Sequence, residues 1–215
     1  LEHFTPVELL GLTATPERAD GLQILHWFDD RIAAELRLWD AIDQGYLCPF
    51  TYFGIFDGLD LTSVPWKRGI GYDVEGLTSL ITANDLWAKF VLKQVHEHSD
   101  DITTMKALGF CVSVDHARYM ARIFNDAGIT SEAIWASTAP DERRSALQRL
   151  AAGTTKVIFS VDLFNEGLDI PSIDTVLLLR PTESAVVFLQ QLGRGLRLSP
   201  ETGKSCLTVL DFIGQ

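Results

Sequence analysis

A glutamine and two arginines near the C-terminal end of the chain have a spacing that could bind phosphate groups. Gln190, Arg194 and Arg197 stand at positions i, i+4 and i+7, which a continuous helix would place on one face. A guanidinium group keeps its charge near neutral pH and can donate two parallel hydrogen bonds to phosphate oxygens. The same residues also fit an exposed helix with solvated arginines, so this pattern alone leaves both interpretations open.

Two glycines interrupt the segment and favour the functional interpretation. Gly193 and Gly195 each cost a helix about 1 kcal/mol relative to alanine. Their presence indicates either a close approach of the backbone to a neighbour or an early end of the helix. The apolar stripe expected to bury this helix consists of Ala185, Leu189, Leu192 and Leu196.

A polar loop from 162 to 171 follows a predicted strand upstream. Ligands of open α/β sheets bind at the carboxyl ends of the strands, so this loop is a candidate binding segment. Gly167 could form a turn with positive φ, and Asp169 could accept hydrogen bonds from a hydroxyl group or an arginine. The alternative is a loop carboxylate that only caps nearby backbone N–H groups.

Three further features each have a functional and a structural interpretation. The hydroxyl groups of Thr13 and Thr15 could bind a neighbouring loop, although a simple turn explains them as well. Residues 66–68, a tryptophan followed by lysine and arginine, could stack on single-stranded nucleic acid or form a solvated loop with a tucked tryptophan. His116 opens an amphipathic segment and is more typical of a capping or packing histidine than of a catalyst.

Composition limits the class of protein. The 215 residues are 47% hydrophobic and 22% charged, which is typical of a soluble globular protein. A net charge of −11 restricts any contact with nucleic acid to a local patch. No apolar run is long enough for a membrane helix and the N-terminus does not resemble a signal peptide, so we expect a cytoplasmic protein with no membrane partner.

Several motifs are absent from the sequence. It holds no G-x-x-x-x-G-K-[ST] phosphate loop, and no Asp-Glu-x-His motif for magnesium precedes Thr13. The chain therefore lacks its own residues for the β- and γ-phosphates and for the metal. Cys48, Cys111 and Cys206 are odd in number and widely spaced, which predicts free thiols and no protein metal site.

Strand and helix patterns alternate along most of the chain. The alternation predicts an α/β fold with a mainly parallel sheet flanked by helices on both faces. A segment near 57–73, rich in Gly, Pro, Asp and Ser, predicts a loop or irregular insertion. Thr138 and Gly153 are the expected caps of one helix, and Gly45 the expected stop of another. Strands are predicted at 9–14, 50–56, 107–114, 132–135, 156–161, 175–179 and 205–212, and helices at 29–42, 84–98, 115–127, 140–152 and 184–192.

Taken in order, four segments resemble the motifs of superfamily-two helicases. The segment 13–15 resembles motif III, 110–113 motif IV, 160–171 motif V, and 190–197 motif VI with its Q-x-x-G-R-x-x-R pattern. The amino-acid sequences of segments 10–18 and 36–42 are similar to those of bacterial restriction-type and excision-repair-type DNA helicases.

The resemblance implies a division of the chain and a fold. Residues 1–45 would be the tail of a first RecA-like lobe, including motif III. Residues 46–215 would be the second RecA-like lobe, a three-layer P-loop NTPase-like domain that lacks the phosphate loop. ATP would bind in the cleft between the two lobes, with Mg²⁺ held by the missing first lobe.

The resemblance also implies roles for individual residues. Arg194 and Arg197 would be arginine fingers that reach the γ-phosphate, and Gln190 would sense the same phosphate. Gly167 and Asp169 would bind nucleotide or couple it to lobe closure.

The remaining motif residues would couple ATP to a bound nucleic acid, which the resemblance indicates is DNA. These residues are Thr13, Thr15, Ser113, Ser160 and Asp162. In one place the sequence departs from many family members, because Val161 stands where they have a threonine that holds a nucleic-acid phosphate.

Three functions are compatible with these observations. The first is the second motor lobe of an ATP-dependent DNA helicase or translocase, which would not hydrolyse ATP in isolation. The second is a degenerate lobe that acts as a regulatory or protein-interaction module. The third is a flavodoxin-like domain that binds a small molecule, against which stands the lack of a Gly-rich turn at the first strand.

Overall fold

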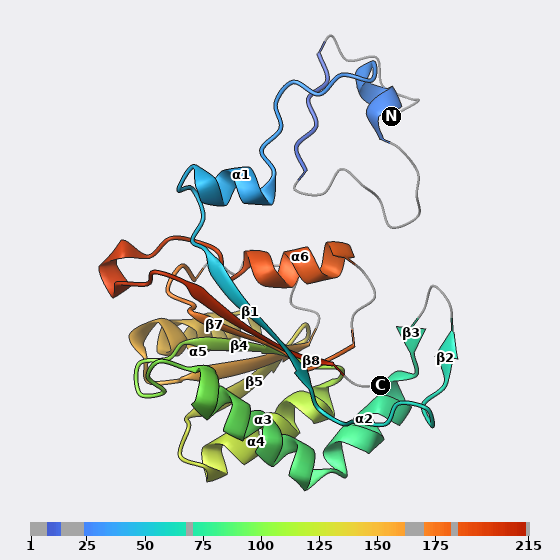
Figure 1. Ribbon diagram of the computed structural model, residues 1–215, viewed down its shortest axis with the longest axis vertical. Coiled ribbons are helices and arrows are strands. Elements are labelled where there is room, and N and C mark those ends of the chain that lie inside the picture. Colours follow the sequence, from blue (N-terminus) through green and yellow to red (C-terminus); the bar gives the residue numbers. More distant parts are fainter. Residues whose placement is uncertain (1–7, 14–23, 68–70, 162–169, 182–184, 214–215) are drawn as a thin grey trace.

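Six strands form one sheet in which every neighbouring pair is parallel. The computed structural model describes residues 8–13, 24–67, 71–161, 170–181 and 185–213. Across the sheet the order is β1-β8-β7-β4-β6-β5 (Figure 1). The strands are β1 (Phe50–Phe56), β4 (Ala107–Phe110), β5 (Ser131–Trp135), β6 (Val157–Val161), β7 (Thr175–Leu178) and β8 (Leu207–Ile213).

The central strands are buried on both faces. Every residue of β4, β6 and β7 is buried, and apart from Ser160 and Thr175 their sequences are apolar runs without polar alternation. Such runs are typical of parallel strands, because helices cover both faces of a parallel sheet.

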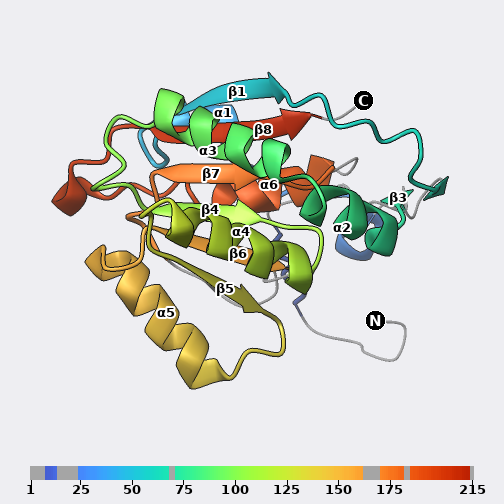
Figure 2. The ribbon, with the colours of Figure 1, turned by 90° about the horizontal axis from the view of Figure 1, so that it is seen from below.

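Helices cover both faces of the sheet. Figure 1 shows α6 on one side and α3 and α4 on the other, and Figure 2 shows α3 and α4 crossing the near face of the sheet. Each face has its own cluster of buried apolar side chains. The predicted three-layer α/β fold is therefore confirmed. The helices are α1 (Leu38–Asp43), α2 (Val74–Thr82), α3 (Asp85–His98), α4 (Val114–Asp126), α5 (Pro140–Ala152) and α6 (Ala185–Gly193).

The bounds of α5 follow from its first and last residues. Pro140 occupies the first turn, where its missing N–H is no loss, and Gly153 ends the helix with a φ of 76°. The prediction that Thr138 caps this helix is wrong. Ala139 is the N-cap, and the Thr138 hydroxyl instead accepts a hydrogen bond from the Trp135 N–H at 3.0 Å.

The N-terminal part of the chain departs most from the predictions. Residues 9–13 form no strand, because among the described residues no strand pairs with them to share backbone hydrogen bonds. Of the helix predicted at 29–42, only α1 forms, preceded by a 3₁₀ turn, η1 (Leu25–Phe28). Asp29 and Asp30 have φ of 53° and 55°, which no α-helix permits. Ile32, Leu36 and Trp39, whose spacing would place them on one apolar face of that helix, are exposed in this structure, and a short helix without a packing surface is unstable.

The predicted insertion near 57–73 is irregular but anchored. Leu59, Leu61 and Val64 are buried in the core, and Asp57 accepts a hydrogen bond from the Trp87 indole at 2.8 Å. The insertion also contains a short antiparallel strand pair, β2 (Trp66–Lys67) and β3 (Gly71–Tyr72). Trp66 is exposed on this strand pair, so the expectation of a tucked tryptophan is wrong.

An ion pair joins α5 to the edge strand β5, and it gives a prediction for stability. Arg149 donates through Nε to Glu132 Oε1 at 2.7 Å and through a terminal nitrogen to Oε2, while the Thr155 hydroxyl also donates to Oε1. The hydrogen bond from Arg149 is the main cause that lowers the pKa of Glu132, against the opposing effect of burial.

A carboxylate whose pKa is lowered by folding stabilises the fold above its ordinary pKa, and that contribution is lost as the pH falls through the lowered value. We expect Glu132→Gln to reduce the free energy of unfolding by about 1 kcal/mol at neutral pH. The difference from wild type should shrink below a pH of about 4, in urea unfolding measured across pH. Glu97→Gln, at an exposed ion pair with Lys93, is the control. A difference that does not change with pH would contradict the assignment.

Candidate functional site

The segment with the two arginines leaves the helix before it reaches them. α6 ends at Gly193, Arg194 lies in the following turn, and Arg197 lies at a bend beyond it. The turn is closed by the Gly195 N–H, which donates to the Leu192 carbonyl at 2.9 Å. The prediction that one helical face carries Gln190 and both arginines is therefore wrong, and the early end of the helix explains why.

Gly195 makes the close backbone approach that the sequence predicted. A Cβ atom at this position would lie 2.8 Å from Leu207 Cδ2, which is closer than real Cβ contacts allow. A Cβ atom at Gly193 would meet no atom within 4 Å. The two glycines therefore differ: Gly193 is the last residue of α6, and Gly195 lets the turn pack against β8.

Alanine substitutions separate these two roles. We expect Gly195→Ala to lower the free energy of unfolding by about 1–3 kcal/mol, because the methyl group would push against the Leu207 side chain. We expect Gly193→Ala, the matched control, to be neutral or to stabilise by up to about 1 kcal/mol, because it adds a helix former in open space. Urea unfolding measures both, and equal effects would show that the approach to Leu207 does not matter.

Backbone hydrogen bonds fix the turn to the start of β1. The Cys48 N–H donates to the Leu196 carbonyl at 2.8 Å, and the Cys48 thiol donates to the Gly195 carbonyl at 3.6 Å. The side chains of Leu192 and Leu196 are buried against the sheet. The turn is thus a fixed part of the domain.

The polar side chains of this segment differ in exposure. Gln190 and Arg197 are exposed and Arg194 is half-buried, so all three can reach a ligand at the surface. Gln191 is fully buried, and neither of its amide atoms has a hydrogen-bond partner within the residues that the structure describes. Leu189 is exposed, contrary to its predicted place in the buried stripe.

Two of the residues predicted to couple ATP to nucleic acid, Ser113 and Ser160, lie toward the carboxyl edge of the sheet, where the parallel strands end. Ser113 follows β4, where its hydroxyl accepts the His116 N–H at 3.2 Å and lies 2.8 Å from the Thr78 hydroxyl. Ser160, on neighbouring β6, is buried and donates to the Gly109 carbonyl at 3.4 Å. Both hydroxyls are used inside the domain, so a role in nucleic-acid coupling stays a prediction.

The other predicted site residues are described only in part. Thr13 is exposed in an irregular stretch. Thr15, Asp162, Gly167 and Asp169 lie outside the described residues. Their roles also stay predictions.

His116 is a packing residue, as its sequence context indicated. It is fully buried beside Trp87, with ring centroids 5.8 Å apart, and its Nδ1 accepts the Val112 N–H at 3.3 Å. Burial lowers the pKa of His116 to about 3, so the imidazole is neutral at neutral pH.

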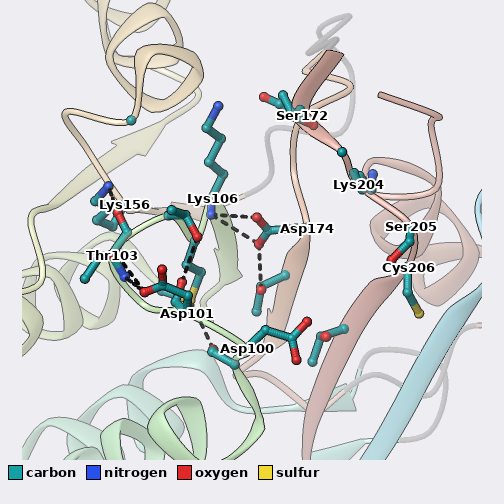
Figure 3. Close-up of a pocket in the computed structure, with 18 of the residues that line it drawn as sticks. Asp100, Asp101, Thr103, Lys106, Lys156, Ser172, Asp174, Lys204, Ser205 and Cys206 are labelled. Carbon is teal, nitrogen blue, oxygen red and sulfur yellow. Dashed lines mark hydrogen bonds between the residues drawn. The ribbon is translucent and has the colours of Figure 1, made fainter. Parts of the chain in front are cut away.

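A polar cavity of about 560 Å³ lies at the amino edge of the sheet, where the sequence predicted no site (Figure 3). Three of its charged side chains are hydrogen-bonded within the domain. Lys106 Nζ donates to the Ala151 carbonyl at 2.7 Å, Lys156 Nζ to the Thr103 carbonyl, and Asp174 accepts the Lys106 N–H at 3.1 Å. The signal in the sequence was the position of these residues at or just before the start of predicted strands.

Two features are absent from the described residues. None of the helices there is both long and apolar enough to cross a membrane. No group of three or more His, Cys, Asp or Glu side chains there could hold a metal ion.

The family model of the helicase conserved C-terminal domain matches residues 90–199, just over half of the chain. The chain belongs to this helicase family. The match contains the segments that resemble motifs IV, V and VI, so the predicted resemblance to the C-terminal lobe of superfamily-two helicases is confirmed. β1 and β8 lie outside the matched range but belong to the same sheet. The proposed division at residue 45 stays a prediction.

Named relatives agree with this family. The Saccharomyces cerevisiae protein named as ATP-dependent helicase IRC3 is 30% identical over 220 residues, covering 100% of this chain and 31% of the yeast protein. The EcoAI endonuclease subunit, a type I restriction enzyme subunit of Escherichia coli, is 23% identical over 99% of this chain and 28% of its own length. The chain thus spans less than a third of the length of these two relatives.

Solved structures share the fold. A fragment described as the HsdR subunit of a type I restriction enzyme from Vibrio vulnificus YJ016 has a TM-score of 0.63 and 24% identity, covering 80% of this chain and 33% of that one. The E. coli DEAD-box protein SrmB has a TM-score of 0.51 and 23% identity, covering 60% of this chain and 72% of that one.

Proposed function

We propose that this helicase domain is the second motor lobe of an ATP-dependent DNA helicase or translocase. In this proposal Arg194 and Arg197 are arginine fingers that contact the γ-phosphate of ATP, and Gln190 senses the same phosphate. The observation that carries the proposal is the anchored turn after α6, which presents a half-buried and an exposed arginine from a fixed backbone.

The described residues fit one side of a nucleotide site. Two guanidinium groups can donate paired hydrogen bonds to phosphate oxygens and stabilise the charge that develops as the γ-phosphoryl group is transferred. ATP supplies the phosphoanhydride bond whose cleavage drives the motor. Gly167 and Asp169 would complete this side of the site, and Mg²⁺ would be held by the first lobe.

The nucleic-acid contact belongs to the same proposal. The motif sequences resemble those of restriction-type and excision-repair-type helicases, which favours DNA as the bound nucleic acid. Because the net charge is −11, we expect the contact to be local, through Ser113, Ser160 and Asp162, with Thr13 and Thr15 linking it to ATP.

The full-length protein tests the proposal. Its ATP hydrolysis should be stimulated by DNA and should fall sharply in Arg194→Ala, whereas the 215-residue chain alone should hydrolyse no ATP, because it lacks a phosphate loop. Adding single-stranded DNA, duplex DNA and RNA separately identifies the nucleic acid. A full-length protein without nucleic-acid-stimulated hydrolysis would instead support a regulatory module.

A further inference from the structure

Lys204 lies against residues 194–197, the arginine turn that follows α6 and includes the bend at Arg197. The chain leaves the turn, passes through a 3₁₀ turn, η3 (Pro200–Thr202), and reverses at Gly203, where φ is 72°. A β-bridge between Ser199 and Lys204 closes this reversal. The reversal places the Lys204 side chain between the arginine turn and the amino edge of β7 and β8.

The Lys204 ammonium uses its three N–H donors on three carbonyl groups. It donates to the carbonyls of Gly195, Arg197 at 2.8 Å and Pro171 at 3.1 Å. An ammonium group has three donors, which matches the number of these carbonyls. Two of the acceptors belong to motif VI, and the third is the last residue of motif V.

Lys204 and Cys48 together hold the whole turn. The carbonyls of Gly195 and Arg197 bind Lys204, and the carbonyl between them, on Leu196, accepts the Cys48 N–H at 2.8 Å. Three consecutive carbonyls beyond the end of α6 are thus bound by groups from other parts of the chain. A turn that contains a glycine depends on such bonds for a fixed shape.

The surroundings of Lys204 show that its three hydrogen bonds, called the clamp, lie partly buried inside the domain. Burial lowers the pKa of the Lys204 ammonium, and the neighbouring Cys48, Asp174 and Cys206 oppose that effect. Lys106 and Lys156, which line the same cavity, each donate to one carbonyl, at Ala151 and Thr103, away from the motifs.

We propose that Lys204 is a positioning residue, which fixes the turn bearing Arg194 and Arg197 relative to the end of motif V. This inference rests on the proposed function, because it needs the arginines to act on ATP. A displacement of about 1 Å in a group that acts in the transition state can cost roughly 100-fold in rate. Loss of the clamp should therefore lower kcat much more than it raises the KM for ATP.

The test compares variants of the full-length protein in DNA-stimulated ATP hydrolysis. We expect Lys204→Met to lower kcat by about 10- to 100-fold with a smaller change in KM. Lys106→Met, which removes an ammonium from the same cavity, is the matched control and should keep the wild-type kcat. If Lys204→Met does not fold, Lys204→Gln, whose amide keeps two donors, replaces it.

A triple variant distinguishes positioning from general stability. If Lys204 acts through the arginines, Lys204→Met should cause no further loss in a protein that already carries Arg194→Ala and Arg197→Ala. A wild-type kcat in Lys204→Met, or a loss that adds in full to that of the arginine variants, would overturn the inference. If the arginine variants alone keep the wild-type rate, the proposed function itself fails.

Discussion

Replacing Arg194 by alanine in the full-length protein is expected to lower DNA-stimulated ATP hydrolysis by about 10³-fold or more. An arginine finger stabilises charge that develops only in the transition state, so the loss should fall on kcat, with a smaller change in the KM for ATP. The half-buried side chain and the anchored backbone of Arg194 are what such a role requires.

Two further variants make this result specific. Arg194→Lys keeps the positive charge but loses the planar pair of donors, so it should recover only a small part of the lost rate. Arg122→Ala is the matched control, because Arg122 is an exposed arginine on α4, across the sheet from α6, where it pairs with Asp126 at 3.8 Å. Arg122→Ala should hydrolyse ATP at the wild-type rate.

Arg197 provides an independent check of the same site. It is more exposed than Arg194, and Arg197→Ala should also lower kcat. Hydrolysis at the wild-type rate by a stably folded Arg194→Ala protein would remove that residue from the catalytic site. A wild-type rate of hydrolysis in both variants would show that neither arginine belongs to the catalytic site.

The elements that could be predicted from sequence carry their own boundary signals. β1 was predicted with its observed bounds because Phe50–Phe56 is rich in aromatic and β-branched residues and is followed by a segment rich in Gly, Pro, Asp and Ser. α5 was predicted with its observed bounds because Pro140 and Gly153 mark its ends. The bounds of both elements depend on residues within or next to them, so the local sequence is sufficient to predict those bounds.

The errors arise where packing decides the structure. Ile32, Leu36 and Trp39 have helical spacing, yet they are 54%, 53% and 65% exposed, and only α1 becomes helical. Periodicity shows that a helix would be amphipathic, but the helix forms only where a surface covers its apolar face.

In the candidate site, too, local patterns could be predicted from sequence and contacts between distant segments could not. The motif pattern singled out Gln190, Arg194 and Arg197 from their order and spacing, and their roles stay predictions. The end predicted for this helix, at residue 192, lies one residue from the observed end of α6 at Gly193. Lys204 was missed because a single lysine after a glycine forms no pattern. Its bond to Pro171 spans 33 residues of sequence and depends on how β7 and β8 lie side by side.

The largest expected loss of stability comes from Phe159 at the centre of β6. Its side chain is fully buried, its ring centroid lies 4.9 Å from that of Phe124 on α4, and the two rings meet edge to face. Phe159→Ala should lower the free energy of unfolding by about 3–5 kcal/mol, since it removes buried apolar surface and leaves a cavity between the sheet and α4. Urea unfolding measures this change, with exposed Phe56→Ala on β1 as the control.

The contact of Phe159 with Gly109 makes the cause of this loss testable. A Cβ atom at Gly109 would lie 2.5 Å from Cδ1 and 2.8 Å from Cε1 of the Phe159 ring, so Gly109→Ala alone should cost about 1–3 kcal/mol. Phe159→Leu shortens the side chain and makes room for the new methyl group. In the double variant the two costs should therefore sum to less than their separate values, by about 1 kcal/mol or more. Additive costs would show that Gly109 is required for a reason other than the ring packed against it.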